Sequence, residues 1–289
     1  MKLIESSVQI IEEKDPYKMI ELAGRTCYRS ENNITKDSAK EFVDRMIKLG
    51  HGAMLEHGTI YLKIRETVNG NIPPAMLYWR DCANQKYSKV YTRLESDSPY
   101  SANYEVLYVT TNLRVLVENN RIDDLEYQCE PTEYHERRIT VKFICDRGVS
   151  HEFVRHRVFS FAQESTRYCN YSKDKFNNEI TFIQPSWNYF KTACYIGIDN
   201  FDGYIFERAL RDAERYYFKL IEKGWKPQQA RQVLPNATKT ELVMTGFESD
   251  WKGFFKLRCS GAAHPDARKL ADELKSLMNV KNIELNSVK

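Results

Sequence analysis

The pattern of apolar and polar positions along the chain predicts alternating strands and helices. Segments with apolar residues at every third or fourth position are expected to be helical, and β-branched or alternating segments are expected to be strands. The expected strands are 7–11, 59–64, 139–145 and 239–245. The expected helices are 16–23, 37–49, 151–157 (capped by Ser150), 202–223, 227–234, 250–258 and 265–278, with an irregular run over 158–172. This order favours an α/β or α+β fold with a mixed central sheet flanked by helices.

One long segment, 65–137, does not fit this regular order. It is polar and rich in Tyr, Asn and Ser. Its short periodic stretches at 76–82 and 104–117 cannot be assigned to helix or strand from their pattern. We interpret it as an elaboration inserted into a single catalytic domain that spans 1–289. A chain of this length can bury a core large enough for one such domain.

Composition indicates a globular protein whose basic sites are local. The 43 Lys and Arg residues nearly balance the 40 Asp and Glu residues, and the formal net charge is only +3. The 7 cysteines are scattered without a C-x-x-C pair, which argues against a disulfide framework or a zinc ribbon and suits a reducing compartment. The first residues lack a basic start followed by a long apolar run. We therefore expect a soluble, cytoplasmic protein without a metal site, a membrane partner or a nucleic-acid partner.

The candidate chemistry is concentrated in the string RHRVFSFAQESTRY at 155–168. The window from 137 to 173 contains eight Lys and Arg residues and three acidic residues, so its net positive charge exceeds that of the whole chain. Guanidinium groups offer forked donors that match phosphate or carboxylate. A phosphate-bearing ligand is one interpretation. The other is a basic surface helix whose arginines pair with Glu152 and Glu164. The neighbouring apolar residues favour burial of some of these basic residues, which argues for a bound partner.

The spacing of the string identifies a family. Arg155, His156 and Arg157, then seven residues, then Ser165 resembles the signature of the flavin-dependent thymidylate synthases. Three further segments resemble that family in the same order: GHGAMLEH at 50–57, QARQVLP at 229–235 and FFKLRCSGAAHPDAR at 254–268. The resemblance implies that family's fold and a methyltransferase activity, the reductive methylation of dUMP to dTMP. It also implies 5,10-methylenetetrahydrofolate as carbon donor, FAD reduced by NADPH as hydride source, and a homotetramer with sites shared between subunits.

The same resemblance assigns roles to individual residues. The residues implied to contact FAD are Arg155, His156, Arg157, Gln163 and His51. The residues implied to contact dUMP are Glu152, Arg155, Gln163, Glu164, Ser165, Arg167, Arg231 and Arg258. Arg258, Ser165 and His51 are the implied catalytic residues. A fixed positive charge at Arg258 would favour the uracil ring deprotonated at N3 and so activate its C5.

Some positions depart from the family pattern. Phe247 and Ser249 stand where many members have an Asn and an Arg that contact FAD, and Gln163 and Glu164 stand slightly later than the Asn-Glu pair of shorter members. No G-x-G-x-x-G fingerprint is present, so the flavin prediction rests on the resemblance. Cys259 is expected to be a packed small residue and not a nucleophile.

Two other function classes compete with this interpretation. An RNA or single-stranded DNA binding module could use the basic and aromatic 153–173 segment, with arginines on phosphates and Phe159, Phe161 and Tyr168 stacked on bases. Its weakness is the near-neutral total charge. A serine hydrolase could use Ser165 with His156, but no G-x-S-x-G elbow surrounds Ser165.

Overall fold

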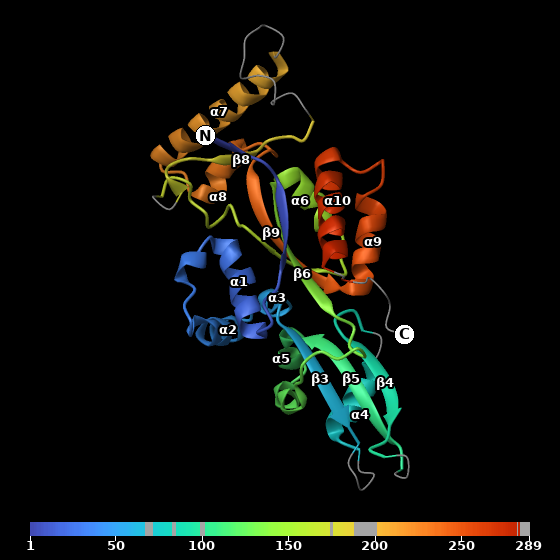
Figure 1. The fold of residues 1–289 in the computed structure, drawn as a ribbon. Helices are drawn as coiled ribbons and strands as arrows, with labels where there is room; N and C mark the ends of the chain where they lie inside the picture. The colour runs from blue at the N-terminus through green and yellow to red at the C-terminus, as the bar shows by residue number, and fades with distance from the viewer. Residues whose placement is uncertain are drawn as a thin grey trace.

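A four-stranded antiparallel sheet forms the centre of the molecule (Figure 1). The computed structural model describes residues 1–66, 72–82, 85–98, 102–173, 176–187, 201–281 and 283. The strand order is β2-β6-β9-β7, with β2 at Ser7–Ile11, β6 at Arg138–Asp146, β9 at Lys239–Phe247 and β7 at Ser160–Gln163. All nine residues of β9 are buried, because helices cover both faces of this strand.

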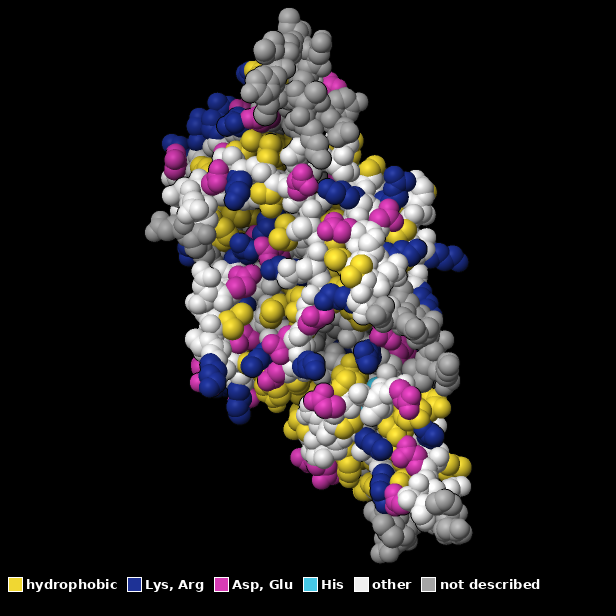
Figure 2. All heavy atoms as spheres, in the orientation of Figure 1, with side chains coloured by type: hydrophobic (Ala, Val, Ile, Leu, Met, Phe, Trp, Pro, Cys, Tyr) yellow, Lys and Arg dark blue, Asp and Glu magenta, His cyan; other side chains and the backbone are white. Residues whose placement is uncertain are grey.

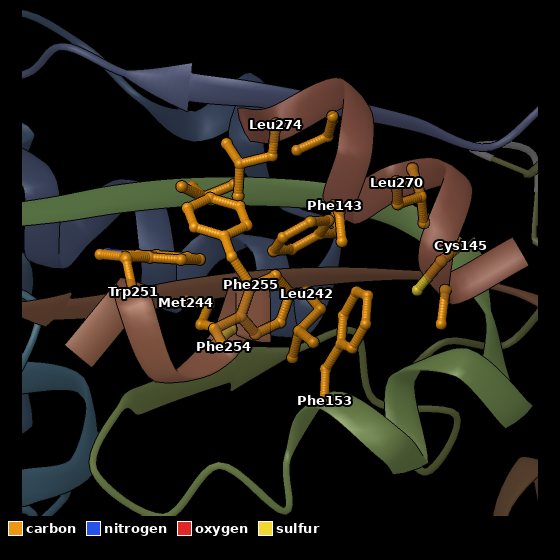
Figure 3. Packing of buried hydrophobic residues seen from close by; sticks show 14 of the residues in the cluster. Phe143, Cys145, Phe153, Leu242, Met244, Trp251, Phe254, Phe255, Leu270 and Leu274 are labelled. Carbon is orange, nitrogen blue, oxygen red and sulfur yellow. The ribbon is translucent and has the colours of Figure 1, made fainter. Parts of the chain in front are cut away.

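The main hydrophobic core lies on one face of this sheet. Phe143 and Leu242 from the sheet pack against Phe254 and Leu270 from the covering helices, as Figure 3 shows. These helices are α6 (Arg147–Phe153), α9 (Glu248–Arg258) and α10 (Pro265–Val280). The other face is covered by α1 (Pro16–Tyr28) and α3 (Gly52–Leu55), with α2 (Ser38–Lys48) packed on α1.

The segment expected as an elaboration builds most of a second sheet, and the core on this sheet also contains buried residues of α1, α2 and α3. This antiparallel sheet has the order β3-β5-β4, with β3 at Thr59–Arg65, β5 at Tyr104–Asn112 and β4 at Lys89–Glu95. Its helical cover is α4 (Pro74–Asp81), α5 (Leu113–Glu118) and η2 (Ile122–Tyr127). The fully buried Trp79 donates its indole N–H to Asp124 at 2.8 Å. Because β3 belongs to this sheet, the second unit begins at Thr59, earlier than the polar composition indicates.

A small third sheet pairs the N-terminal strand with a distant one. Strand β1 (Lys2–Ile4) runs parallel to β8 (Thr181–Ile183), and Phe182 bridges to Thr238 just before β9. Nearby lie α7 (Phe201–Glu222), α8 (Pro227–Ala230) and η5 (Arg231–Val233), while η1 (Glu31–Asn33) follows α1. The predicted α/β (α+β) fold with sheets flanked by helices is confirmed, but the central sheet is antiparallel and not mixed, because the parallel pair β1-β8 forms a sheet of its own.

Two local predictions are wrong. The helix expected over 151–157 with Ser150 as cap is instead α6, which ends at Phe153. Asp146 caps it by accepting the Val149 N–H at 2.9 Å, while Ser150 is one turn inside and donates to the Arg147 carbonyl. The run 158–172 is not wholly irregular, because it contains β7. Among the helices of the described residues, none combines the length and the hydrophobicity that a membrane span requires.

Candidate active site

The first cluster of predicted site residues surrounds Arg258, the last residue of α9. Its Nε donates to His156 Nε2 at 2.9 Å, its Nη1 to the Glu152 carboxylate, and its Nη2 to the Glu152 carbonyl at 2.6 Å. The Arg258 side chain is only 14% exposed. Helix α6 supplies Glu152, and the turn after it supplies His156. Both lie about a hundred positions before Arg258 in the sequence, and together they fix its guanidinium group.

His156 is a neutral hydrogen-bond acceptor in this cluster. Burial, with the Arg258 charge as a second cause, lowers the pKa of His156 to about 4. Because Nε2 accepts from Arg258, the ring carries its proton on Nδ1. The ring lies 5.1 Å from that of Phe254, which anchors it to the main core. His156 is therefore the partly buried residue of the Arg155-His156-Arg157 triplet.

Arg155 and Arg157, on either side of His156, are exposed. Within the described part of the chain, neither has a carboxylate at ion-pair distance; Glu152 pairs with Arg258, and Glu164 pairs with Lys239. The interpretation in which Glu152 and Glu164 neutralise the string's arginines is therefore wrong. Two guanidinium groups are left available for an anionic ligand.

The second cluster lies at the end of β7. The Gln163 side-chain amide donates to Ser150 Oγ at 2.9 Å and to Thr240 Oγ1 at 3.2 Å. Ser165 donates its backbone N–H to the Cys27 carbonyl of α1 at 2.9 Å, and its hydroxyl oxygen accepts the Arg167 N–H at 3.3 Å. Strand β7 connects the two clusters, since it begins three residues after Arg157 and ends two residues before Ser165.

The other predicted arginines flank Ser165. Arg231 Nη1 donates to Thr166 Oγ1 at 2.9 Å, which brings η5 beside the turn after β7. Arg167 is exposed, and its guanidinium lies 5.3 Å from the centre of the Tyr168 ring. Tyr168 in turn contacts Tyr28 with ring centres 5.1 Å apart. Ser165, Arg167 and Arg231 therefore lie around one short turn.

A buried network of charges beneath Ser165 was missed from the sequence. Lys239 Nζ donates to Glu164 at 2.8 Å and also to Glu241, which is paired with Lys142 and Arg29 as well. Glu164 and Glu241 are 3% exposed each. The signal was the placement of Lys239 and Glu241 two positions apart in a strand that is otherwise apolar or hydroxylated, because such charges need partners when buried.

Three further positions stand apart from these clusters. His51 is exposed just before α3, a helix that packs on β7, and among the described contacts it touches neither cluster. Phe247 is buried, with its ring 5.5 Å from the Arg138 guanidinium, and Ser249 donates its N–H to Glu136 at 3.1 Å. The Phe247 ring offers no polar group to a cofactor, in agreement with the departure noted in the sequence.

The arrangement bears on the competing functions. Ser165 Oγ accepts from Arg167 and His156 Nε2 accepts from Arg258, so the described hydrogen bonds contain no Ser-His pair. On the face drawn in Figure 2, basic and acidic side chains are interspersed and form no broad basic footprint. In the described part of the chain, no group of three or more His, Cys, Asp or Glu could hold a metal ion.

One comparison with known proteins covers most of the chain. A family model described as "Thymidylate synthase complementing protein" (Thy1) matches residues 9–69 and 129–281, more than half of the chain. The unmatched stretch between them holds α4, β4, β5 and α5, most of the second sheet.

Curated relatives match over shorter lengths. A flavin-dependent thymidylate synthase of Sulfolobus acidocaldarius is 32% identical over 133 residues, 45% of this chain and 46% of the relative. One of Sulfurisphaera tokodaii is 34% identical over 137 residues, 47% of each chain. The chain spans about half the length of the curated relatives it matches. A solved structure of PolB, a UMP/dUMP methylase of Streptomyces cacaoi bound with 5-Br dUMP, is 15% identical, with a TM-score of 0.45 and coverage of 97% and 93%.

Proposed function

Because the chain belongs to the Thy1 family of thymidylate synthase complementing proteins, we propose that it is a flavin-dependent thymidylate synthase. Its reaction would be the reductive methylation of dUMP to dTMP, with 5,10-methylenetetrahydrofolate as carbon donor and NADPH as reductant. The observation that carries the proposal is the contact of Arg258 with His156 and Glu152, which joins two separate family-like segments at one guanidinium group.

The residues present fit an anionic flavin nucleotide. Arg155 and Arg157 are exposed cations without a carboxylate partner among the described residues, and a pyrophosphate would supply the missing charge. His156 between them is neutral and packs on Phe254, so it offers a polar edge beside an apolar surface. Arg155, His156 and Arg157, with His51 and Gln163, would hold FAD, which supplies the hydride that completes the methyl group.

Ser165, Arg167 and Arg231 would bind the phosphate of dUMP. Arg231 is already oriented by Thr166, and Arg167 is exposed, with its guanidinium 5.3 Å from the centre of the Tyr168 ring. Gln163 is held by Ser150 and Thr240, so it can position the nucleotide without reorganising. Glu164 is 3% exposed and paired with Lys239, so we assign it to supporting this turn and not to the dUMP contact expected from the resemblance.

Arg258 would stabilise negative charge on the uracil ring. A guanidinium group has five N–H donors, and the three described hydrogen bonds use one each from Nε, Nη1 and Nη2. Two donors are therefore left for the substrate. Glu152 and His156 fix the group before the substrate arrives, and preorganised donors of this kind are the ones that stabilise charge most strongly.

A homotetramer with shared sites fits the exposure of the basic residues. Arg155, Arg157 and Arg167 lie open on one subunit, and a neighbouring copy would complete the enclosure that excludes water from a redox site. We place the enzyme in the cytoplasm, a reducing compartment that suits its scattered cysteines. No observation favours the nucleic-acid-binding alternative.

Two measurements test the proposal. The visible absorbance spectrum of the purified protein, before and after reconstitution with FAD, reports flavin binding. Tritium release from dUMP labelled at C5, with NADPH and methylenetetrahydrofolate and with or without added FAD, reports turnover. A colourless protein that cannot be reconstituted and releases no tritium would refute the assignment.

A further inference from the structure

Within the part of the chain that the structure describes, strand β4 has a neighbouring strand on one side only. It pairs with β5 in continuous register from Lys89 to Glu95, and Figure 1 shows it on the outer side of the three-stranded sheet. An edge strand presents a row of backbone N–H and C=O groups, and many proteins shorten, kink or interrupt such an edge with proline. Strand β4 has 7 residues, no proline and no bulge in its pairing, so its edge can accept a further strand.

The side chains of β4 leave this edge accessible. Thr92, Arg93 and Leu94 are exposed, and the apolar Leu94 is 66% exposed. Because neighbouring strand residues point to opposite faces, Leu94 and Thr92 share a face with Val90, which packs against the core of the second sheet. The opposite face of the strand carries Lys89, Tyr91, Arg93 and Glu95. A strand that is complementary to this edge therefore needs apolar residues on one face and charged residues on the other.

The charges of β4 favour one antiparallel register with a second copy of the same strand. A two-fold axis through Thr92 places Lys89 of each copy opposite Glu95 of the other, so two pairs of opposite charge form. Because side chains alternate between the faces, the nearest other two-fold registers are centred on Tyr91 or on Arg93. The first places Lys89 opposite Arg93, and the second places Arg93 opposite itself. Both registers bring like charges together, which disfavours them.

The register centred on Thr92 also matches the uncharged side chains. Leu94 of each copy lies opposite Val90 of the other, so the exposed Leu94 gains an apolar neighbour on the face of the core. Tyr91 lies opposite Arg93, and a guanidinium group is attracted to the face of an aromatic ring. Arg93 already makes this kind of contact within one chain, where it lies 4.5 Å from the centre of the Tyr134 ring. Charge and apolar pairing therefore select the same register.

We propose that two copies of this chain associate through their β4 strands, which pair antiparallel about a two-fold axis at Thr92. The pairing joins two three-stranded sheets into one sheet of six strands and adds roughly six to eight backbone hydrogen bonds. The contact is separate from the clusters around Arg258 and Ser165 and does not depend on the proposed activity. The 7 residues on each side are fewer than the roughly 20–30 of a standard interface, so we expect weak association through this contact alone.

Cysteine cross-linking of the full chain tests the register. Thr92→Cys places a thiol opposite the same thiol of the second copy, where Cα atoms about 4.5–5.5 Å apart suit a disulfide. Leu94→Cys is the matched control, because Leu94 is also exposed on the same face, but its two copies lie four residues apart along the strands, about 14 Å. With oxidised glutathione and roughly 100 μM protein, we expect Thr92→Cys to form a reducible dimer at least about tenfold faster than Leu94→Cys or the parent chain.

Charge substitutions added to Thr92→Cys test the pairing itself. Either Lys89→Glu or Glu95→Lys alone places like charges opposite each other at both ends of the contact and should slow cross-linking about tenfold at low salt. A mixture of the two variants restores opposite charges at both ends, so its rate should return to within about threefold of the Thr92→Cys rate. Glu95 also pairs with Lys63 at 3.4 Å, so urea unfolding checks that each variant folds.

Two results would overturn the proposal. One is equal cross-linking of Thr92→Cys and Leu94→Cys, which decides the question even where a charge variant fails to fold. The other is a mixture of folded charge variants that cross-links no faster than either variant alone. Both results would mean that the charged residues of β4 keep its edge free of a second copy.

Discussion

Replacing Arg258 with Ala is the most direct test of how the proposed active site works. The substitution removes the two guanidinium donors that remain for the uracil ring, together with the three hydrogen bonds that fix the group. Losing preorganised donors that act on developing charge lowers kcat by roughly a thousandfold, about 4 kcal/mol of transition-state stabilisation. Glu152 is 27% exposed and can be rehydrated, so we expect the free energy of unfolding to fall by only about 1 kcal/mol.

The assay is tritium release from C5-labelled dUMP, run beside a fluorescence titration of FAD and urea unfolding. FAD affinity should change by less than about threefold, because Arg155 and Arg157 are untouched and His156, although it loses the Arg258 hydrogen bond, still packs on Phe254. The pKa of His156 should rise in the variant, since the Arg258 charge is one of the two causes that lower it. Arg258→Lys should recover part of the activity, and Arg268→Ala, an exposed arginine on α10, is the matched control. Turnover within tenfold of the parent, or an equal loss of FAD binding, would refute the reasoning.

Three further predictions concern charge and burial. Cys259→Ala should retain substantial turnover in the tritium assay, because burial raises the pKa of this thiol to about 11; complete inactivation of a folded variant would reopen a cysteine nucleophile. Burial also raises the pKa of Glu248 to about 7, so its protonated form stabilises the fold below about pH 4.5 and that contribution is lost as the pH rises to 7. Glu248→Gln should therefore unfold in urea with a flatter dependence on pH across that window and be more stable at pH 7 by up to about 2 kcal/mol; an unchanged pH dependence would contradict the assignment. Lys239→Met leaves Glu164 and Glu241 buried with fewer partners and should lower the free energy of unfolding by about 3 kcal/mol, and a loss below about 1 kcal/mol would mean that this network is dispensable.

The elements that the sequence determined by itself are those whose burial repeats at a fixed period. Strands β2, β6 and β9 and the helix α10 lie close to their predicted positions, because each alternates buried and exposed residues or is buried throughout, and that pattern is written in consecutive residues. The family-like string from Arg155 to Ser165 could also be found without coordinates, since its spacing is local. The candidate site residues near it followed from this string, while His51, Arg231 and Arg258 followed from the three other family-like segments.

Other features depended on contacts between distant residues. The four residues of β7 become a strand only by pairing with β9, and the second sheet forms only when β3 meets β5 about fifty residues later along the chain. Asp146 and Ser150 are both good helix caps, and the path of the backbone from β6 selects Asp146.

Charge pairing was likewise decided by the tertiary structure. Glu152 could have paired with Arg155 or Arg157 next to it, yet it pairs with Arg258, and Glu164 pairs with Lys239. Hydrophobic periodicity records whether a residue is buried, but it carries no information about which distant group lies opposite. The partner of each charge is therefore fixed only when the sheet and its helices pack together.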